Sequence, residues 1–178
     1  MIQGDSTEYE LLTKWARECK HKHLSCEIGV REGMGSKIIL DNLKPKTHIG
    51  IDPYGNLNYQ HYDDTGAYQC DYTESMRVQL LKDMAEYENF DLLHMTDIDF
   101  MNRFWDAGPF DFVHFDGPHM TRDVMREAVW FADRSQKGSR FVFDDYPKYN
   151  MPKIADLLSF WNFKQIEAGK NKICYEQF

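Results

Sequence analysis

A glycine-rich stretch at residues 24–36 constrains the fold of this chain more than any other feature. An apolar run at 24–28 leads into it, and an apolar segment at helical spacing follows at 38–40. Three glycines lie between them: Gly29, Gly33 and Gly35. A strand, a glycine turn and a helix in this order present backbone N–H groups and the positive end of a helix to a ligand. The stretch therefore predicts an α/β domain with a ligand at this turn, although a glycine-rich turn without a ligand stays open.

The spacing of the glycines narrows the choice of ligand. A dinucleotide fingerprint, G-x-G-x-x-G, would need a third glycine where Ile38 stands. The stretch instead reads E-x-G-x-x-x-G-x-G from Glu27, and this resembles the first motif of class I S-adenosylmethionine (SAM)-dependent methyltransferases. The resemblance implies that the methionine part of SAM lies over the turn. The residues implied to bind it are Glu27, Gly29, Gly33, Gly35 and Ser36.

Two further acidic residues are candidates for the nucleoside part of the same ligand. Asp52 ends a predicted strand at 48–52, where a carboxylate has two oxygens to accept hydrogen bonds from the two ribose hydroxyls. The alternative is an ordinary surface aspartate at a strand end. Asp97 follows a third predicted strand at 91–95, and the resemblance implies a place near the adenine. Asp97 serves equally well as the N-cap of the helix that begins there.

The order of predicted elements defines the fold class. Strands alternate with helices until a final hairpin, which favours an α/β fold with a Rossmann-like, doubly wound, mostly parallel sheet of seven strands and helices on both faces. The predicted strands lie at 24–28, 48–52, 91–95, 110–115, 140–143, 163–167 and 172–176. A capping box of Thr7 and Glu10 is expected to begin the first helix, within residues 1–22, and Lys137-Gly138 to end the helix after residue 120. We expect one domain over residues 1–178.

Residues 53–73 interrupt this alternation. They show no periodicity and carry five tyrosines among polar side chains. Long segments without structure are uncommon in compact domains unless they are functional or disordered, and disordered segments are usually poor in aromatics. The segment is predicted to be a lid or a substrate loop. The alternative is an extra helix or hairpin that packs on the outside.

Composition excludes several classes of function. The net charge of −8, with no long basic run, disfavours nucleic-acid binding. No stretch approaches the ~20 apolar residues of a membrane span, and the first residues do not resemble a signal peptide. The four cysteines form no C-x-x-C pair, and Cys26 and Cys174 lie in apolar runs, as buried thiols do. These features favour a reduced, cytoplasmic protein. The histidines at 21–23 are more typical of a solvated linker than of a metal site.

Three aspartates are expected to converge at the ends of two strands: Asp116, Asp144 and Asp145. Carboxylates that lie close together repel one another unless a cation is among them. Oxygen ligands suit Mg²⁺ or another hard divalent ion, and such an ion lowers the pKa of a hydroxyl that it binds. His119 is placed to take the hydroxyl proton as a catalytic base.

Residues 115–146 resemble the metal-dependent O-methyltransferases of class I, the family 24-like group with catechol-type and macrolide-sugar members. The resemblance implies that Asp116, Asp144 and Asp145 hold the metal, that Asp116 also contacts SAM and takes part in catalysis, and that His119 is the base of a D-x-x-H form. The alternatives are that Asp144 or Asp145 only caps a turn, that Asp116 contacts only the SAM ammonium group, and that His119 moves no proton.

We therefore expect SAM-dependent methyl transfer to a hydroxyl oxygen of a small molecule, such as a sugar or a catechol-like diol, assisted by a divalent metal. A second hypothesis is a SAM- or nucleoside-binding module, or a partner-binding protein, without turnover. A third, a nicotinamide oxidoreductase, is opposed by Ile38. The sequence leaves a homo-oligomer open and does not identify the acceptor.

Overall fold

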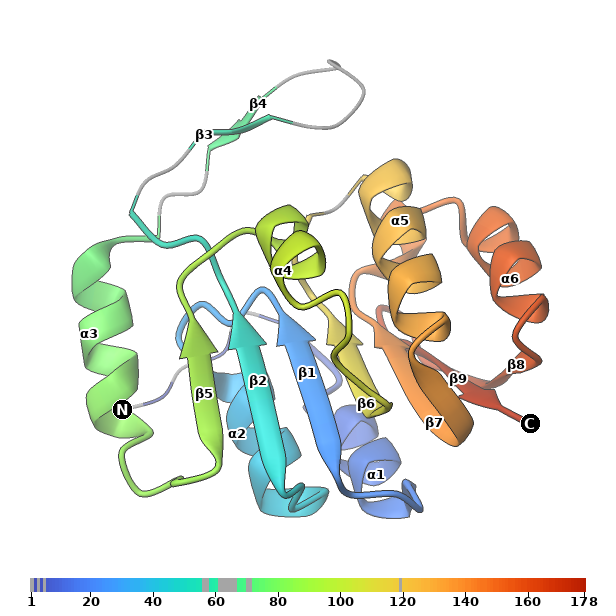
Figure 1. Cartoon of the computed structure of the whole chain (residues 1–178), viewed down its shortest axis with the longest axis horizontal. Helices are drawn as coiled ribbons and strands as arrows, with labels where there is room; N and C mark the ends of the chain where they lie inside the picture. The colour runs from blue at the N-terminus through green and yellow to red at the C-terminus, as the bar shows by residue number, and fades with distance from the viewer. Residues whose placement is uncertain are drawn as a thin grey trace.

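A seven-stranded sheet forms the centre of the molecule, in the order β5-β2-β1-β6-β7-β9-β8. The computed structural model describes the chain except residues 1, 3, 5, 56, 57, 61–66, 70, 71 and 119, and it describes 58–60 and 67–69 by their backbone alone. The strands of this sheet are β1 (Leu24–Ile28), β2 (Thr47–Ile51), β5 (Phe90–Leu93), β6 (Phe110–Phe115), β7 (Ser135–Phe143), β8 (Phe163–Ala168) and β9 (Ile173–Gln177). The helices are α1 (Tyr9–Glu18), α2 (Met34–Asn42), α3 (Glu74–Asp83), α4 (Asp97–Arg103), α5 (Thr121–Ala132) and α6 (Met151–Ser159), and a short 3₁₀ helix spans Tyr146–Lys148. Figure 1 shows the five parallel strands from β5 to β7 with their carboxyl ends on one side.

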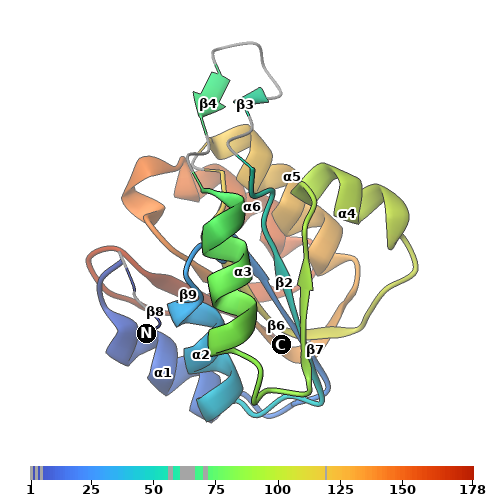
Figure 2. The same ribbon diagram turned by 90° about the vertical axis from the view of Figure 1, so that its left-hand side faces the viewer.

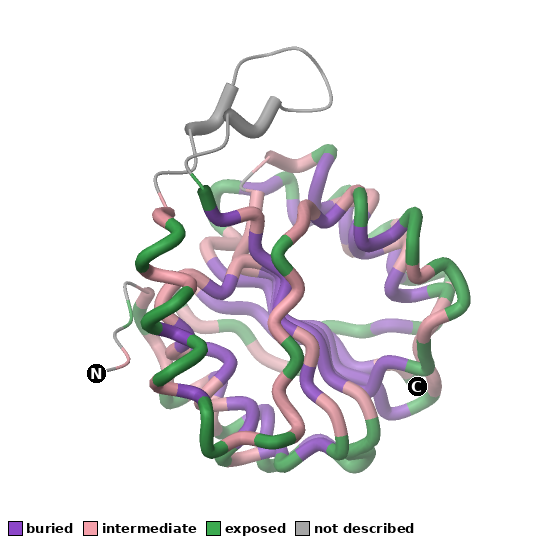
Figure 3. The backbone as a smooth tube through the Cα atoms, turned by 60° about the vertical axis from the view of Figure 1, so that its left-hand side comes forward, coloured by how far each residue is buried: buried purple, intermediate pink, exposed green. Residues whose placement is uncertain are grey.

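Helices cover both faces of the sheet, as the sequence predicts (Figure 2). On one face α1 and α2 bury Leu12, Trp15 and Ile39 in one apolar cluster, and α3 packs beside α2 through Leu80. On the other face α4, α5 and α6 contribute to the largest cluster, which includes Phe131. Because the sheet is covered twice, its central strands are buried along their length (Figure 3), and all six residues of β6 are buried.

The C-terminal hairpin predicted from the sequence is present. β9 runs antiparallel to both β7 and β8, so it is the one reversed strand of the sheet. Its register against β7 pairs Phe143 with Ile173 and Arg140 with Glu176. The Arg140 guanidinium donates to the Glu176 carboxylate at 2.8 Å, so an ion pair crosses between the two strands.

The insertion at 53–73 contains a two-stranded antiparallel hairpin of its own, β3 (Asn58–Gln60) and β4 (Ala67–Gln69). This hairpin is not part of the main sheet, and Figure 1 shows it beyond the carboxyl ends of the parallel strands. The base of the insertion is fixed: the buried Tyr54 donates its hydroxyl to the Arg31 carbonyl at 2.5 Å, and Gly55 N donates to the Tyr72 carbonyl at 2.8 Å. The lid function stays a prediction, and most of the tip lies outside the described residues.

The capping box predicted at the first helix is wrong. Helix α1 begins at Tyr9, its N-cap is Glu8 in the left-handed region, and no side chain caps it. The reason is that the neighbouring side chains bind the β8–β9 turn instead. Thr7 Oγ1 accepts from the Asn171 side chain at 2.7 Å, and the Glu8 carboxylate accepts from three backbone N–H groups of that turn.

The predicted end of the fifth helix is also wrong. Helix α5 ends at Ala132, and Gly138 lies within β7 at a φ of +92°. Strand β7 begins at Ser135, which pairs with Phe110, and its register against β6 is irregular before Phe112 pairs with Arg140. The glycine therefore belongs to an irregularity in a strand, where a positive φ has the same sequence signature as a helix end. None of the described helices has the length and hydropathy to cross a membrane.

Candidate active site

The glycine turn connects β1 to α2 and lies against the carboxyl end of β6. Gly29 has a φ of +83°, and a Cβ on it would lie far inside van der Waals contact of the Asp116 backbone carbonyl. Asp116 N donates to the Ile28 carbonyl at 2.9 Å, which holds the two strand ends together. Gly33, also at positive φ, is the N-cap of α2, so the first turn of this helix faces the same strand ends. Backbone N–H groups at a helix start favour a negative or polar ligand group.

Gly35 has a structural role beside the predicted one, which stays a prediction. A Cβ at this position would collide with the carboxylate of the protein's own Glu27. The glycine thus makes room for a buried acidic side chain behind the turn. Ser36, predicted to bind the cofactor, is also buried and donates its hydroxyl to the Glu27 carboxylate.

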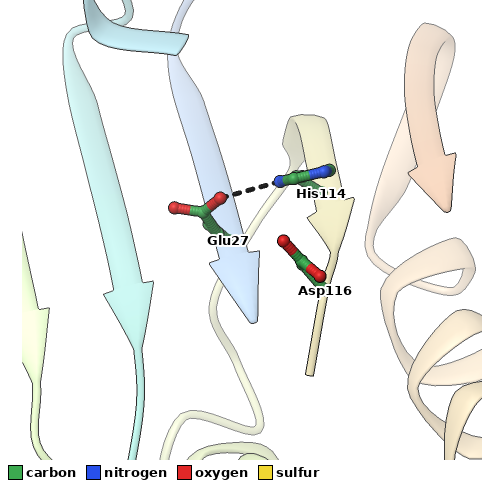
Figure 4. A group of neighbouring side chains, drawn as sticks. All are labelled: Glu27, His114 and Asp116. Carbon is green, nitrogen blue, oxygen red and sulfur yellow. Dashed lines mark hydrogen bonds and ion pairs between the residues drawn. The ribbon is translucent and has the colours of Figure 1, made fainter. Parts of the chain in front are cut away.

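A hydrogen-bonded network surrounds Glu27, and strand register creates it. Register pairs Ser25 with His48 across β1 and β2, and Glu27 with His114 across β1 and β6. His114 Nδ1 lies 2.7 Å from Glu27 Oε1 (Figure 4), His48 Nε2 lies 3.0 Å from Ser36 Oγ, and His48 Nδ1 lies 2.8 Å from Ser25 Oγ. Burial lowers the pKa of His48 to about 4, so this ring is neutral at pH 7. Since Ser36 gives its proton to Glu27, His48 donates through Nε2 and accepts from Ser25 through Nδ1.

A cleft of about 120 Å³ opens over this network. Its described lining includes the predicted residues Glu27, Gly29, Gly35, Asp116, Asp144 and Asp145, and also Ser6, Tyr9, Arg31, Glu32, Tyr72 and Asn171. Pockets that bury a whole small ligand usually have volumes of ~300–1,000 Å³. The cleft therefore corresponds to part of a ligand site, the part over the glycine turn.

Asp52 lies directly after β2 and is completely buried. Its Oδ2 accepts from the backbone N–H groups of Val30 and Arg31, at 2.9 Å each, which fixes the carboxylate beside the glycine turn. Its Oδ1 is buried and has no hydrogen-bond partner among the residues that the structure describes. Burial raises the pKa of Asp52 to about 6, although the two backbone hydrogen bonds oppose the shift. A buried oxygen without a partner is costly, so a ligand that donates a hydrogen bond here would stabilise the site.

Asp144 does not lie free among other carboxylates. Its Oδ1 accepts from Lys172 Nζ at 2.7 Å and from Asp145 N at 2.9 Å, and its Oδ2 accepts from Ser6 Oγ at 2.5 Å. Burial raises the pKa of Asp144, but the electrostatic interactions with His114 and Lys172 and the hydrogen bonds from Lys172 and Ser6 outweigh it and hold the pKa below its ordinary value. Lys172 is fully buried, and the sequence analysis did not identify it.

Asp145 is likewise near a lysine: Lys148 Nζ donates to its Oδ2 at 2.6 Å. Two of the three aspartates predicted to hold a metal are therefore each neutralised by an ammonium group. The residues as they stand do not fit an ion coordinated by all three, and a metal there stays a prediction. A different set, Glu27, His114 and Asp116, brings one ligand atom each within 4.8 Å of one another (Figure 4), but Glu27 and His114 already share a hydrogen bond.

Asp97 is the first residue of α4 and is buried. The alternative that it caps the helix is wrong, because the Thr96 hydroxyl accepts from Asp99 N and is the N-cap. The Asp97 carboxylate accepts from the Arg126 guanidinium at 2.8 Å, and Asp97 is absent from the described lining of the cleft. A place near the adenine stays a prediction.

The predicted base, His119, lies outside the described residues. The residues that the sequence analysis missed are His48, His114, Lys172 and Ser6. His114 had a signal in the sequence, since it is a polar residue inside the apolar run at 110–115. Lys172 and Ser6 had none, because their roles depend on which strands and loops are neighbours.

The comparisons with known proteins agree with this geometry. The profile of a family described as a methyltransferase domain matches residues 26–146. A search among curated proteins finds no match. Among solved structures, an O-methyltransferase from Bacillus cereus in complex with SAH is similar at a TM-score of 0.64 and 11% identity, over 99% of this chain and 83% of that one.

Two other similar structures are those of methyltransferases named for different acceptors. The N-methyltransferase NodS from Bradyrhizobium japonicum has a TM-score of 0.63 at 9% identity, over 95% of this chain and 93% of that one. An rRNA methylase from Streptococcus thermophilus has a TM-score of 0.63 at 11% identity, over 99% of each chain. At these identities the likeness shows the fold alone. The fold is that of class I SAM-dependent methyltransferases. With a family match over most of its length, the chain belongs to this methyltransferase family.

Proposed function

We propose that this protein transfers a methyl group from SAM to a hydroxyl oxygen of a small molecule, with a sugar or a catechol-like diol as the acceptor class. The observation that carries the SAM part is the buried Asp52 Oδ1, which has no partner among the described residues and lies at the strand end beside the glycine turn. A ribose hydroxyl would satisfy it. When bound, SAM supplies the methyl group from its sulfonium.

The residues of the chain bind and orient the two reactants. Gly29 and the start of α2 lie under the methionine part, and Glu27 and Asp116 give the cleft a negative wall that suits the cationic groups of SAM. Asp52 fixes the ribose. Holding both reactants in line removes much of the barrier of a two-molecule reaction, by ~7–11 kcal/mol in favourable cases.

The oxygen acceptor is supported by the pattern at residues 115–146, since the similar solved structures show the fold alone. His119 is the proposed base for the hydroxyl proton, and Asp116 is three residues before it in the sequence. A divalent ion at Asp116, Asp144 and Asp145 was expected to assist, but two of these carboxylates pair with lysines, so no step of this proposal depends on it.

Calorimetry with SAM, and then with NAD, tests the cofactor. We expect heat with SAM at about one site per chain and none with NAD. Isotopically labelled SAM should then transfer label to a sugar or a catechol in an acceptor screen, and His119→Ala should lose turnover while its SAM affinity stays within about twofold. No heat with SAM in a folded protein would contradict the proposal. Binding of SAM without transfer to any hydroxyl acceptor would favour a binding module instead.

A further inference from the structure

A fully buried lysine at the wall of the cleft is the feature that the proposed function does not use. Lys172 has 0% of its side chain exposed, and lysine is almost never buried to this degree unless it is paired. Its Nζ donates to Asp144 Oδ1 at 2.7 Å and to Ser6 Oγ at 2.9 Å, and it lies 5.4 Å from the centre of the Tyr9 ring. Ser6, Tyr9 and Asp144 all line the cleft.

Strand register places this lysine opposite Asp144. The β7–β9 ladder pairs Val142 with Cys174 and ends with Phe143 and Ile173, so Asp144 and Lys172 are the two residues directly beyond its last pair. The register thus brings the two residues close together, and both side chains are buried where they meet.

The N-terminal segment closes the arrangement. The Ser6 hydroxyl accepts from Lys172 and donates to Asp144 Oδ2, so the three side chains form a ring of hydrogen bonds. The Glu8 carboxylate fixes the backbone around the lysine by accepting from the N–H groups of Lys170, Asn171 and Lys172, at 2.7, 2.8 and 3.0 Å.

This ring leaves little room for a second cation on the same carboxylate. A divalent ion on Asp144 would have to displace the ammonium or the Ser6 hydroxyl, and until then it would lie close to a buried positive charge. Asp145 has its own ammonium neighbour, Lys148. For Asp144 and Asp145, lysines therefore supply the positive charge that the sequence suggested a metal would supply.

We propose that Lys172 is the resident cation of this cleft: its ammonium group occupies Asp144 in place of a divalent metal ion, and methyl transfer does not require a metal there. The claim about methyl transfer rests on the proposed function, whereas the claim that Lys172 occupies Asp144 does not. It implies that the acceptor is recognised through hydrogen bonds and not through chelation of two adjacent oxygens by a metal, so that one hydroxyl is sufficient for an acceptor.

The claim that Lys172 excludes a divalent ion from Asp144 can be tested without an enzymatic assay. Mn²⁺ binding is measured by calorimetry and by the electron paramagnetic resonance signal of the free ion. Wild type should show no Mn²⁺ site at Asp144 up to about 1 mM. Lys172→Met keeps most of the length of the side chain and removes the charge, and it should gain a Mn²⁺ site with a dissociation constant at least tenfold below that 1 mM limit. The double variant Asp144→Asn with Lys172→Met should lose that site again. Lys148→Met is the matched control: it removes the lysine beside Asp145, and like wild type it should show no Mn²⁺ site at Asp144.

A wild-type Mn²⁺ site that Asp144→Asn abolishes would overturn the proposal, and this arm decides even if Lys172→Met fails to fold. A folded Lys172→Met that gains no site would also overturn it. If wild type binds Mn²⁺ and Asp144→Asn binds it equally well, the ion is bound elsewhere, and this result agrees with the proposal that Lys172 occupies Asp144.

Turnover is then compared with and without EDTA, with SAM affinity measured in the same samples. We expect turnover in EDTA within about twofold of that in Mg²⁺. The claim that no metal is required would be overturned if EDTA abolished turnover while SAM binding was retained. In that case Mg²⁺ would restore turnover in wild type and would not restore it in Asp144→Asn. Failure of SAM to bind would instead contradict the proposed function and leave the Mn²⁺ result standing.

Discussion

A carboxylate that accepts hydrogen bonds from two ribose hydroxyls has to be ionised. The pKa of Asp52 lies only a little below neutral pH, so a small fall in pH protonates it. Its pKa is raised to about 6, chiefly by burial, so the free protein takes up a proton there as the pH falls through 6. The protonated group accepts fewer hydroxyls. We expect the apparent dissociation constant of SAM to rise about tenfold between pH 7.5 and pH 5, because one unit below the pKa leaves about a tenth of the sites ionised.

Calorimetry across this pH range checks the prediction. Asp52→Asn should bind SAM more weakly and with a flat profile, whereas Asp91→Asn, at an exposed position of β5, should keep the wild-type profile. The stability of the protein without ligand depends on pH in the opposite direction to its affinity for SAM. The folded chain holds the Asp52 proton to a higher pH than the unfolded chain does, so the contribution of Asp52 to stability falls as the pH rises from about 4 through 6. A wild-type affinity that is independent of pH would contradict the assignment of Asp52 to the ribose.

Glu27 permits a second prediction at the scale of the residue. Its carboxylate accepts from both Ser36 and His114, and a glutamine would turn an NH₂ group toward one of these donors. We expect Glu27→Gln to lower the free energy of unfolding by about 2–3 kcal/mol, the cost of a lost charged hydrogen bond in a buried site. Urea denaturation measures it, with the exposed Glu10→Gln as the control, expected within about 0.5 kcal/mol of wild type. Equal midpoints for the two variants would show that the network contributes nothing.

At this scale the sequence predicted which acidic residues meet, and it did not predict their partners. Glu27, Asp116, Asp144 and Asp145 line one cleft because parallel strands present their carboxyl ends at the same edge. Lys172 is 28 residues after Asp144 in the sequence, and only the antiparallel pairing of β7 with β9 brings the two together. The expectation of a metal followed from counting negative charges without the positive ones that the fold supplies.

At the scale of the element, the attachment of α1 to the β8–β9 turn is the clearest target. Burial raises the pKa of Glu8, but hydrogen bonds from Lys170, Asn171 and Lys172 and the charge of Lys172 outweigh it and lower the pKa overall. The stabilisation is therefore complete above the ordinary value of 4.5 and is lost as the pH falls through the lower folded value.

We expect Glu8→Gln to cost about 1–2 kcal/mol at pH 7, since the donors then meet a neutral acceptor. The difference from wild type should shrink as the pH is lowered below about 4.5. Urea titrations at pH 7 and pH 4 measure both effects, with Glu10→Gln on the same helix as the control. A difference that is constant across this pH range would mean that the charge of Glu8 is not what stabilises the turn.

Elements were predictable where apolar periodicity is strong. The seven main strands and six helices occur where the pattern predicts them, mostly within one or two residues at each end. The errors are at element ends, because Thr7 and Gly138 carry signals that long-range contacts redirect: the threonine to the hairpin turn, and the glycine to an irregular strand.

At the scale of the whole molecule, one aromatic cluster under α4 and α5 joins these helices to the sheet. The ring of the fully buried Phe131 lies 4.8 Å from that of Phe110, 5.7 Å from Phe115 and 6.2 Å from Phe100 (centroid distances). We expect Phe131→Ala to lower the free energy of unfolding by about 3–5 kcal/mol. Phe160→Ala, at a residue that is 81% exposed, should change it by less than about 0.5 kcal/mol.

Circular dichroism and SAM binding, followed through the same urea titration, measure this effect and show whether the domain unfolds as a unit. Coincident transitions are expected for a single domain of this size. A Phe131→Ala midpoint equal to that of Phe160→Ala would mean that the cluster does not support the fold.

The contacts between residues 6–8 and the β8–β9 turn join segments that are more than 160 positions apart in the chain. Closing so long a loop has a high entropic cost, so this junction is expected to form after the central sheet has been assembled. It is also expected to open at a lower cost than the sheet, since Ser6, Thr7 and Glu8 lie outside the apolar clusters. One wall of the cleft would then be the last part of the described structure to fold and the first to loosen.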